Sequence, residues 1–218
     1  PFHPNGITFR GLLNGEEISM ETFYSIGGGF IVQEKDVLEK QAEPDDILFP
    51  YPIRKAIELE SYCENENLSI STIVYKNELV LKTADKIDFE LNRIWQVMLE
   101  SMYLGCHTEG ELPGGLHVKR RAFDIHAKLI KGTSHTNPED WMTAIRSTNV
   151  KFREILKWVS CFALSVNEVN ASLGRVVTAP TNGSAGVIPA VLMYYLVIEN
   201  HDADFEHIKK FLLTAGEI

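Results

Sequence analysis

The sequence has few cysteines, no excess of basic charge and no long apolar run, and each of these absences excludes a class of protein. Its 218 residues contain three cysteines, Cys63, Cys106 and Cys161. An odd number with wide, unmatched spacing predicts neither a disulfide framework nor a zinc site. Such cysteine usage is typical of a reducing compartment, so we expect a cytoplasmic protein.

The charge and the hydropathy pattern limit the possible partners. The net charge is -9 and the isoelectric point is near 5.3, whereas nucleic acids and anionic membranes attract basic surfaces. The longest apolar run, residues 187–198, contains Pro189 and is shorter than the roughly 20 residues that span a bilayer. We therefore expect no nucleic-acid partner and no membrane partner.

The first third of the chain changes character near residue 50. Alternating residues around Asn14-Gly15 predict a β-hairpin, and the glycines at 27–29 predict a bulge or a close backbone approach. The charged, proline-bearing residues 33–52 predict a linker. We divide the chain into residues 1–45, which include most of the linker, and residues 46–218.

Helical periodicity dominates after the linker. Residues 69–81 favour a helix over a strand, and a further helix is predicted to start near Asn137-Pro138 and to break near residues 147–149. One amphipathic helix that ends near Gly105 has apolar residues at helical spacing, namely Ile87, Leu91, Ile94, Trp95, Met98 and Met102. The predicted fold class is α+β, with the C-terminal part of a β-containing domain followed by a mainly α-helical domain.

An amide-bearing helix face precedes Gly174. The apolar stripe that includes Trp158, Phe162 and Val166 continues to Asn167 and Asn170, which predicts that both amides lie on the core side. A buried amide needs partners for its donors and its acceptor, and these could be neighbouring backbone groups or a ligand. Glu168, one step around the helix, is expected in solvent.

The stretch "TAPTNGSAG", residues 178–186, has two possible interpretations. It offers the short polar side chains of Thr178, Thr181, Asn182 and Ser184, together with the backbone of Gly183. The apolar run that follows predicts a helix whose first turn contains or directly precedes Pro189. Free N–H groups at a helix start suit a carboxylate or a phosphate, but a tightly packed helix cap fits the same pattern.

Three other polar segments also allow two interpretations. "SIGGGF" resembles a phosphate cradle but lacks dinucleotide-binding spacing, and "HPNG" places His3 and Asn5 beside a turn. In "HTEGELPGGLHVKRRA", Arg120 and Arg121 could clamp a carboxylate or form salt bridges that brace the domain.

Taken together, four segments carry a family resemblance. "HPNGITF", "YSIGGGFI", "HTEGELPGGLHVKRRA" and "VNEVNASLGRVVTAPTNGSAGVIPAV" are similar, in this order, to segments of the iron-sulfur-dependent L-serine dehydratases of the single-chain type, also called L-serine ammonia-lyases. In that family a β domain precedes an α domain, in agreement with the change of period near residue 50.

The resemblance implies a lyase that deaminates L-serine to pyruvate and ammonia by cluster-assisted β-elimination of water. It implies a [4Fe-4S] cluster, no pyridoxal phosphate, and a homo-oligomer. It also implies His3 as a catalytic residue and a set of substrate-binding residues, namely Asn5, Asn167, Asn170, Thr178, Thr181, Asn182, Gly183 and Ser184.

Two departures from the family pattern concern the chain ends. The family's "SSSHT" segment is absent, and its cluster cysteines lie in motifs that follow the position of "AGEI", the last four residues here. We therefore expect an internal fragment without cluster ligands, and with no metal-ligand residue of its own, which does not turn over serine alone.

Two alternatives remain open at this point. The first is a catalytically inert small-molecule-binding or regulatory domain. The second is a pyridoxal-phosphate lyase with "SIGGGF" as phosphate cradle, which would need a Schiff-base lysine.

Overall fold

The computed structural model describes residues 4–27, 30–38, 48–177 and 183–218. Within these ranges the chain forms two compact units, which meet in sequence between Leu48 and Phe49. We call residues 4–38 the β unit, and residues 49–177 together with 183–218 the helical unit. The observed fold class is α+β, as the sequence predicts.

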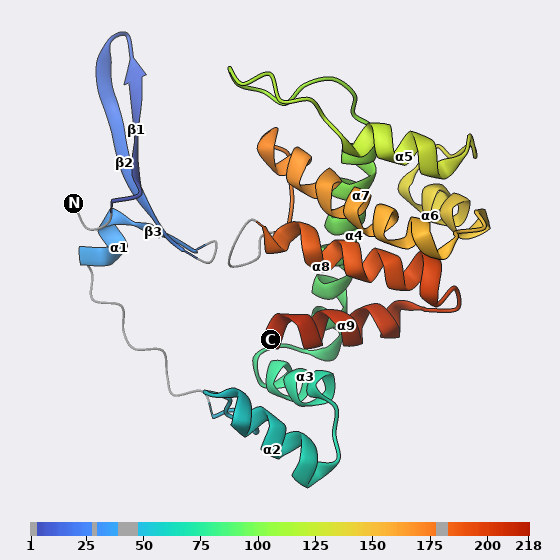
Figure 1. The fold of residues 1–218 in the computed structure, drawn as a ribbon. Coiled ribbons are helices and arrows are strands. Elements are labelled where there is room, and N and C mark those ends of the chain that lie inside the picture. Colours follow the sequence, from blue (N-terminus) through green and yellow to red (C-terminus); the bar gives the residue numbers. More distant parts are fainter. Residues whose placement is uncertain (1–3, 28–29, 39–47, 178–182) are drawn as a thin grey trace. The chain divides into compact units, whose positions relative to one another are not determined.

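The β unit contains a three-stranded antiparallel sheet in the order β1 (Gly6–Leu13), β2 (Glu16–Gly27) and β3 (Phe30–Gln33) (Figure 1). Asn14 and Gly15 form the β1–β2 turn with φ angles of 52° and 88°, the left-handed values that an Asn-Gly hairpin turn requires. The predicted hairpin is therefore confirmed. The β2–β3 register shifts between Ser25 and Gly27, beside the glycines for which we predicted a bulge.

A short helix, α1 (Glu34–Leu38), lies inside the segment for which we predicted a linker. The prolines and charges of residues 33–52 obscured it, although Glu34 and Asp36 in its first turn suit the positive end of a helix. The hydroxyl of Tyr24 on β2 donates to the Glu34 carboxylate at 2.8 Å. This contact fastens α1 to the sheet.

The helical unit starts with α2 (Ala56–Glu66) and α3 (Ile70–Leu81), and α3 confirms the helix predicted for residues 69–81. The elements that follow are α4 (Ala84–His107), α5 (Ala122–Ile130), α6 (Pro138–Ser147), α7 (Phe152–Ala171), α8 (Ser184–Tyr194), the π-helical segment η1 (Tyr195–Glu199) and α9 (Phe205–Glu217). No helix in the described ranges is long and apolar enough to cross a membrane.

Local sequence signals explain where α6 begins and ends. The side chain of Asn137 accepts a hydrogen bond from the backbone N–H of Asp140 at 2.8 Å, and Pro138 occupies the first helical turn. Both residue types are favoured at these positions. The helix ends at Ser147 and α7 begins at Phe152, which confirms the predicted break.

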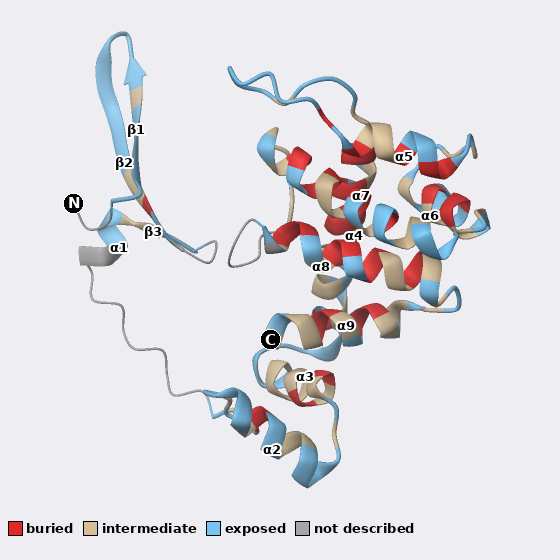
Figure 2. Cartoon of the chain, viewed as in Figure 1, coloured by how far each residue is buried: buried red, intermediate tan, exposed pale blue. Residues whose placement is uncertain are grey.

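The core of the helical unit lies where α4, α7 and α8 pack together, as the buried residues on their facing sides show (Figure 2). Trp95, Met98 and Met102 of α4 are buried, as the predicted apolar stripe requires. A side chain at Gly105 would collide with the backbone of Ser165. Glycine there lets α4 and α7 cross closely, and this crossing holds the C-terminal part of α7 in place.

Candidate functional site

Four of the predicted site residues, His3, Thr178, Thr181 and Asn182, lie outside the described residues. Asn5 lies at the start of the β unit, where its backbone carbonyl accepts a hydrogen bond from the N–H of Ser25 at 3.0 Å. The remaining predicted residues belong to the end of α7 and the start of α8.

The prediction that both amides lie on the core side of α7 is wrong for Asn167. Asn167 is exposed, Asn170 is half-buried, and Glu168, which we expected in solvent, is only 5% exposed. The predicted stripe followed steps of four residues, and each such step advances about 40° beyond a full helical turn. The series from Val159 through Ala163 to Asn167 therefore leaves the core, as its rising exposure shows.

Glu168 caps another helix instead. Its Oε1 atom accepts hydrogen bonds from the backbone N–H groups of Arg121 and Ala122, at 2.7 and 3.3 Å, where α5 begins. Beside it, the Arg120 guanidinium donates to the Ser172 hydroxyl at 2.6 Å. Arg120 is buried, so of the two interpretations of this arginine the contacts favour bracing over a carboxylate clamp.

Asn167 faces the first turn of α8. A Cβ atom on Gly186 would lie 3.1 Å from the Asn167 amide nitrogen, 3.2 Å from its oxygen and 2.8 Å from the carbonyl oxygen of Ala163. Glycine at this position therefore lets α8 begin against the amide. Gly183 directly precedes α8, Ser184 is its first residue, and this first turn precedes Pro189, as predicted.

The arrangement leaves polar groups free for a ligand. Among the described residues, no hydrogen-bond partner contacts the side-chain amide of Asn167 or that of Asn170. No side chain of the residue before α8 caps its first turn, and the N–H groups at a helix start lack partners within the helix, although the N–H of Gly186 donates to the Gly183 carbonyl at 3.3 Å. An amide next to such a helix start can bind a small carboxylate.

The cysteines do not fit an iron-sulfur cluster. Cys106 and Cys161 are fully buried with sulfur atoms 3.7 Å apart, and burial, together with the hydrogen bond to Cys161, raises the pKa of the Cys106 thiol. Cluster ligands must be thiolates. Cys63 lies on α2 and packs against a separate small core around Tyr51, so the three thiols do not converge.

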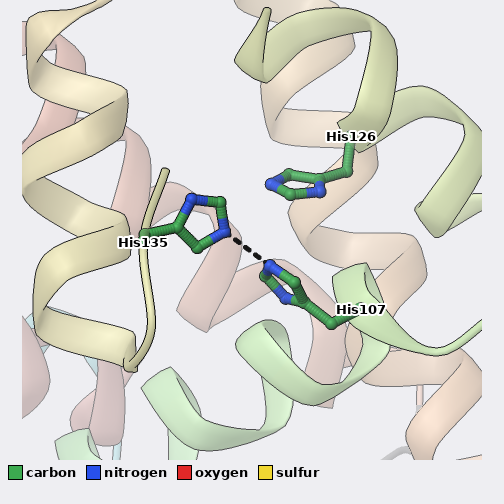
Figure 3. Close-up of side chains that lie close together, drawn as sticks. All are labelled: His107, His126 and His135. Carbon is green, nitrogen blue, oxygen red and sulfur yellow. Dashed lines mark hydrogen bonds between the residues drawn. The ribbon is translucent and has the colours of Figure 1, made fainter. Parts of the chain in front are cut away.

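A cluster of three histidines is the feature that the sequence analysis missed. His107 ends α4, His126 lies on α5 and His135 lies in the loop before α6. Figure 3 shows the three rings turned toward one another, and one nitrogen from each lies within 4.8 Å of the others. The residues are far apart in the sequence, on three elements, so their spacing carried no signal.

The surroundings favour the neutral form of two of these histidines. Burial, followed by the neighbouring His107 and His135, lowers the pKa of His126 to about 3. Burial is also the main cause that lowers the pKa of His107. Neutral imidazole is the form that binds a metal ion, so among the described residues this cluster is the group best suited to hold one.

Comparisons with known proteins cover both units. Residues 65–218 match the family described as serine dehydratase alpha chain, and residues 1–36 match serine dehydratase beta chain. The chain is 40% identical over 216 residues to L-serine dehydratase 2 of Escherichia coli, with 99% of the chain and 44% of that relative covered.

Relatives from two other organisms give the same match. The chain is 40% identical over 219 residues to the L-serine dehydratase of Streptomyces coelicolor, with 100% of the chain and 44% of that relative covered. It is 33% identical over 222 residues to the L-serine dehydratase of Helicobacter pylori, with 99% of the chain and 45% of that relative covered. The chain thus spans less than half the length of these curated relatives.

Proposed function

The chain belongs to the iron-sulfur L-serine dehydratase family, and from this premise we propose that it forms the substrate-binding part of an enzyme that deaminates L-serine to pyruvate and ammonia. The single observation that carries the proposal is the position of the Asn167 amide against Gly186, at the start of α8. This contact places an amide that has no hydrogen-bond partner among the described residues next to a helix start. The family resemblance implies that the end of α7 and the start of α8 both bind the substrate.

Serine offers groups that match this arrangement. Its carboxylate suits the N–H groups at the first turn of α8, with Gly183 and Ser184 at the point of approach. The carboxamide oxygens of Asn167 and Asn170 can accept hydrogen bonds from the substrate ammonium group. Thr178, Thr181 and Asn182 belong to the same proposed set through the resemblance alone, and so do Asn5 and, as the proton-transfer group, His3.

The proposed reaction is a β-elimination. The α-proton and the β-hydroxyl of serine leave as water, which yields 2-aminoacrylate. This enamine tautomerises to an imine, and hydrolysis of the imine consumes one water and releases pyruvate and ammonia. The residues proposed above would fix the carboxylate and the ammonium group, and this fixes the α-carbon relative to the base.

Only the family resemblance supports a [4Fe-4S] cluster as the cofactor in this proposal. Family members use a [4Fe-4S] cluster, but Cys63, Cys106 and Cys161 do not fit one, for the reasons of burial and separation given above. None of the roles proposed for residues of this chain depends on it. By the same resemblance we propose a homo-oligomer, and from the cysteine usage we propose a cytoplasmic protein.

Activity of the complete protein tests the proposal. Under anaerobic conditions, L-serine should yield pyruvate and ammonia in equal amounts, and borohydride should not inactivate the enzyme. Serine binding without any pyruvate would instead favour an inert binding or regulatory domain. Loss of activity after borohydride treatment would favour a pyridoxal-phosphate lyase. Either result would overturn the proposal.

A further inference from the structure

We propose that His107, His126 and His135 form a binding site for one divalent transition-metal ion of the zinc class, a site that uses none of the residues proposed to bind serine. The three rings converge from the end of α4, from α5 and from the α5–α6 loop (Figure 3). Imidazole nitrogens are preferred ligands of Zn²⁺, Co²⁺, Ni²⁺ and Cu²⁺, whereas Mg²⁺ and Ca²⁺ prefer oxygen.

Hydrogen bonds to backbone carbonyls fix the orientation of two of the rings. The Nδ1 atom of His107 lies 2.6 Å from the carbonyl oxygen of Tyr103, and the Nδ1 atom of His135 lies 2.9 Å from that of Thr133. A carbonyl oxygen only accepts, so both Nδ1 atoms carry a hydrogen. Metal-binding histidines typically donate their second N–H to a carbonyl or a carboxylate in this way.

The consequence is that two lone pairs face each other. With both Nδ1 atoms protonated and both rings neutral, the Nε2 atoms of His107 and His135 are acceptors, yet they lie 2.6 Å apart. Such a contact is repulsive unless a cation lies between the two nitrogens. The cation could be an extra proton or a metal ion.

The environment favours the metal ion. The histidines that form ion pairs with carboxylates within the described ranges are His117 and His207, and no carboxylate is paired with the three clustered rings to balance an imidazolium. A bridging proton would serve only the nitrogens of His107 and His135, while the Nε2 atom of His126 would keep its hydrogen bond from the Trp141 indole. A metal ion takes three imidazoles and keeps a fourth position for water or an anion.

Metal binding requires movements of up to about 1.5 Å, because the three nitrogens lie within 4.8 Å of one another and must come to about 3.3 Å. Two zinc–nitrogen bonds of about 2.0 to 2.1 Å at a tetrahedral angle separate the nitrogens by about 3.3 Å, so the His107 and His135 rings must move apart by less than an ångström from 2.6 Å. His135 is in a loop and His107 is the last residue of α4, where such a movement meets little resistance.

Trp141 reports on the third ligand. Its indole N–H donates to the Nε2 atom of His126 at 2.9 Å, and a nitrogen has only one lone pair to offer. When the ion binds this nitrogen, the Trp141 N–H must lose its acceptor. The site is therefore coupled to a buried tryptophan of α6.

Cobalt titration of the full 218-residue chain, freed of metal with EDTA, tests the proposal. We expect one Co²⁺ per chain, with the visible absorption of a tetrahedral centre, no thiolate charge-transfer band in the near ultraviolet, and displacement by Zn²⁺. Zn²⁺ should also shift the indole N–H resonance of Trp141, while that of Trp95 stays in place.

Matched variants locate the site. His135→Ala changes a loop residue and should keep the helical circular dichroism while it lowers Co²⁺ affinity at least tenfold, and His107→Ala should do the same. His201→Ala, on the exposed surface, and Cys63→Ser should bind Co²⁺ as the parent chain does.

Three outcomes would overturn the proposal. The first is an absence of saturable Co²⁺ or Zn²⁺ binding, and the second is affinity that His135→Ala leaves unchanged. The third is a proton resonance shared by the His107 and His135 rings that persists when Zn²⁺ is in excess. None of these readouts depends on serine turnover, so failure here is distinguishable from failure of the proposed function.

Discussion

The carboxylate of Glu168 on α7 accepts a hydrogen bond from the backbone N–H of Arg121, 2.7 Å away, at the start of α5. The side chain also accepts from the next N–H, that of Ala122. A tertiary contact thus caps α5, for which the residue before the helix supplies no side-chain cap. The loop from Thr108 to Arg121 is thereby fixed to α7.

Substitution of Glu168 should destabilise the chain. Glu168→Ala leaves two N–H groups at a buried helix start without their acceptor, which costs about 1 to 3 kcal/mol of unfolding free energy. Glu168→Gln keeps one oxygen as an acceptor and should lose less. Urea denaturation measures both, with the exposed Glu60→Ala as control. Equal stability of Glu168→Ala and the parent would contradict the capping role.

A side chain at Gly186 should separate α7 from α8. Gly186→Ala places a Cβ 2.8 Å from the Ala163 carbonyl oxygen, and relief of that contact costs about 1 to 3 kcal/mol. Thermal unfolding should reveal the loss. Gly216→Ala, with no atom within 4 Å of the added Cβ, should be neutral or slightly stabilising. A neutral Gly186→Ala would show that the helices do not meet as described.

The three cysteines should differ in reactivity. Cys106 and Cys161 are 0% exposed, whereas Cys63 is partly exposed, and burial keeps the Cys106 thiol protonated. An aromatic disulfide reagent should therefore modify Cys63 at least about 100-fold faster than the other two. All three should react in denaturant. Rapid modification of two or three thiols in the native chain would be inconsistent with this core.

Stability of the metal-free chain should fall as the pH falls below about 6.5, the ordinary pKa of histidine. The pKa of His126 is about 3 in the folded chain, so the unfolded chain binds more protons between these values. The resulting loss is at most about 1.4 kcal/mol per pH unit from this residue, and above about pH 6.5 its contribution is constant. The lowered pKa of His107 acts in the same direction.

Urea denaturation in EDTA between about pH 7.5 and pH 5 checks this dependence. His126→Gln removes the titrating group and retains an acceptor for Trp141, so its stability should depend less on pH. An identical pH dependence in the two proteins would assign the effect to other groups.

Periodic patterns predicted most of the fold because they arise from neighbours in sequence. The Asn14-Gly15 turn, the buried stripe of α4 and the Asn137 cap each depend on a few adjacent residues. Burial at the end of α7 was predicted wrongly, because the gradual rotation of a four-residue step moves Asn167 out of the core and the adjacent Glu168 into it.

The histidine cluster could not be predicted, because packing alone brings its residues together. His107 precedes the polar loop, His126 follows it, and α4 and α5 must both pack on α7 before the two rings meet. The candidate substrate site could be predicted from the sequence only in part. Its segments were identified in the sequence, but the contact of Asn167 with Gly186 comes from the α7–α8 packing.

The most direct test of the proposed substrate site is pyruvate formation by the complete protein with Asn167→Ala. The residue is exposed on α7, so the variant should fold with parent stability, and kcat/KM for L-serine should fall by about 100-fold or more as substrate contacts are lost. Asn182→Ala should show a loss of the same order, and Glu60→Ala should retain full activity. Unchanged kinetics of a folded Asn167→Ala protein would contradict a role for this amide in binding serine.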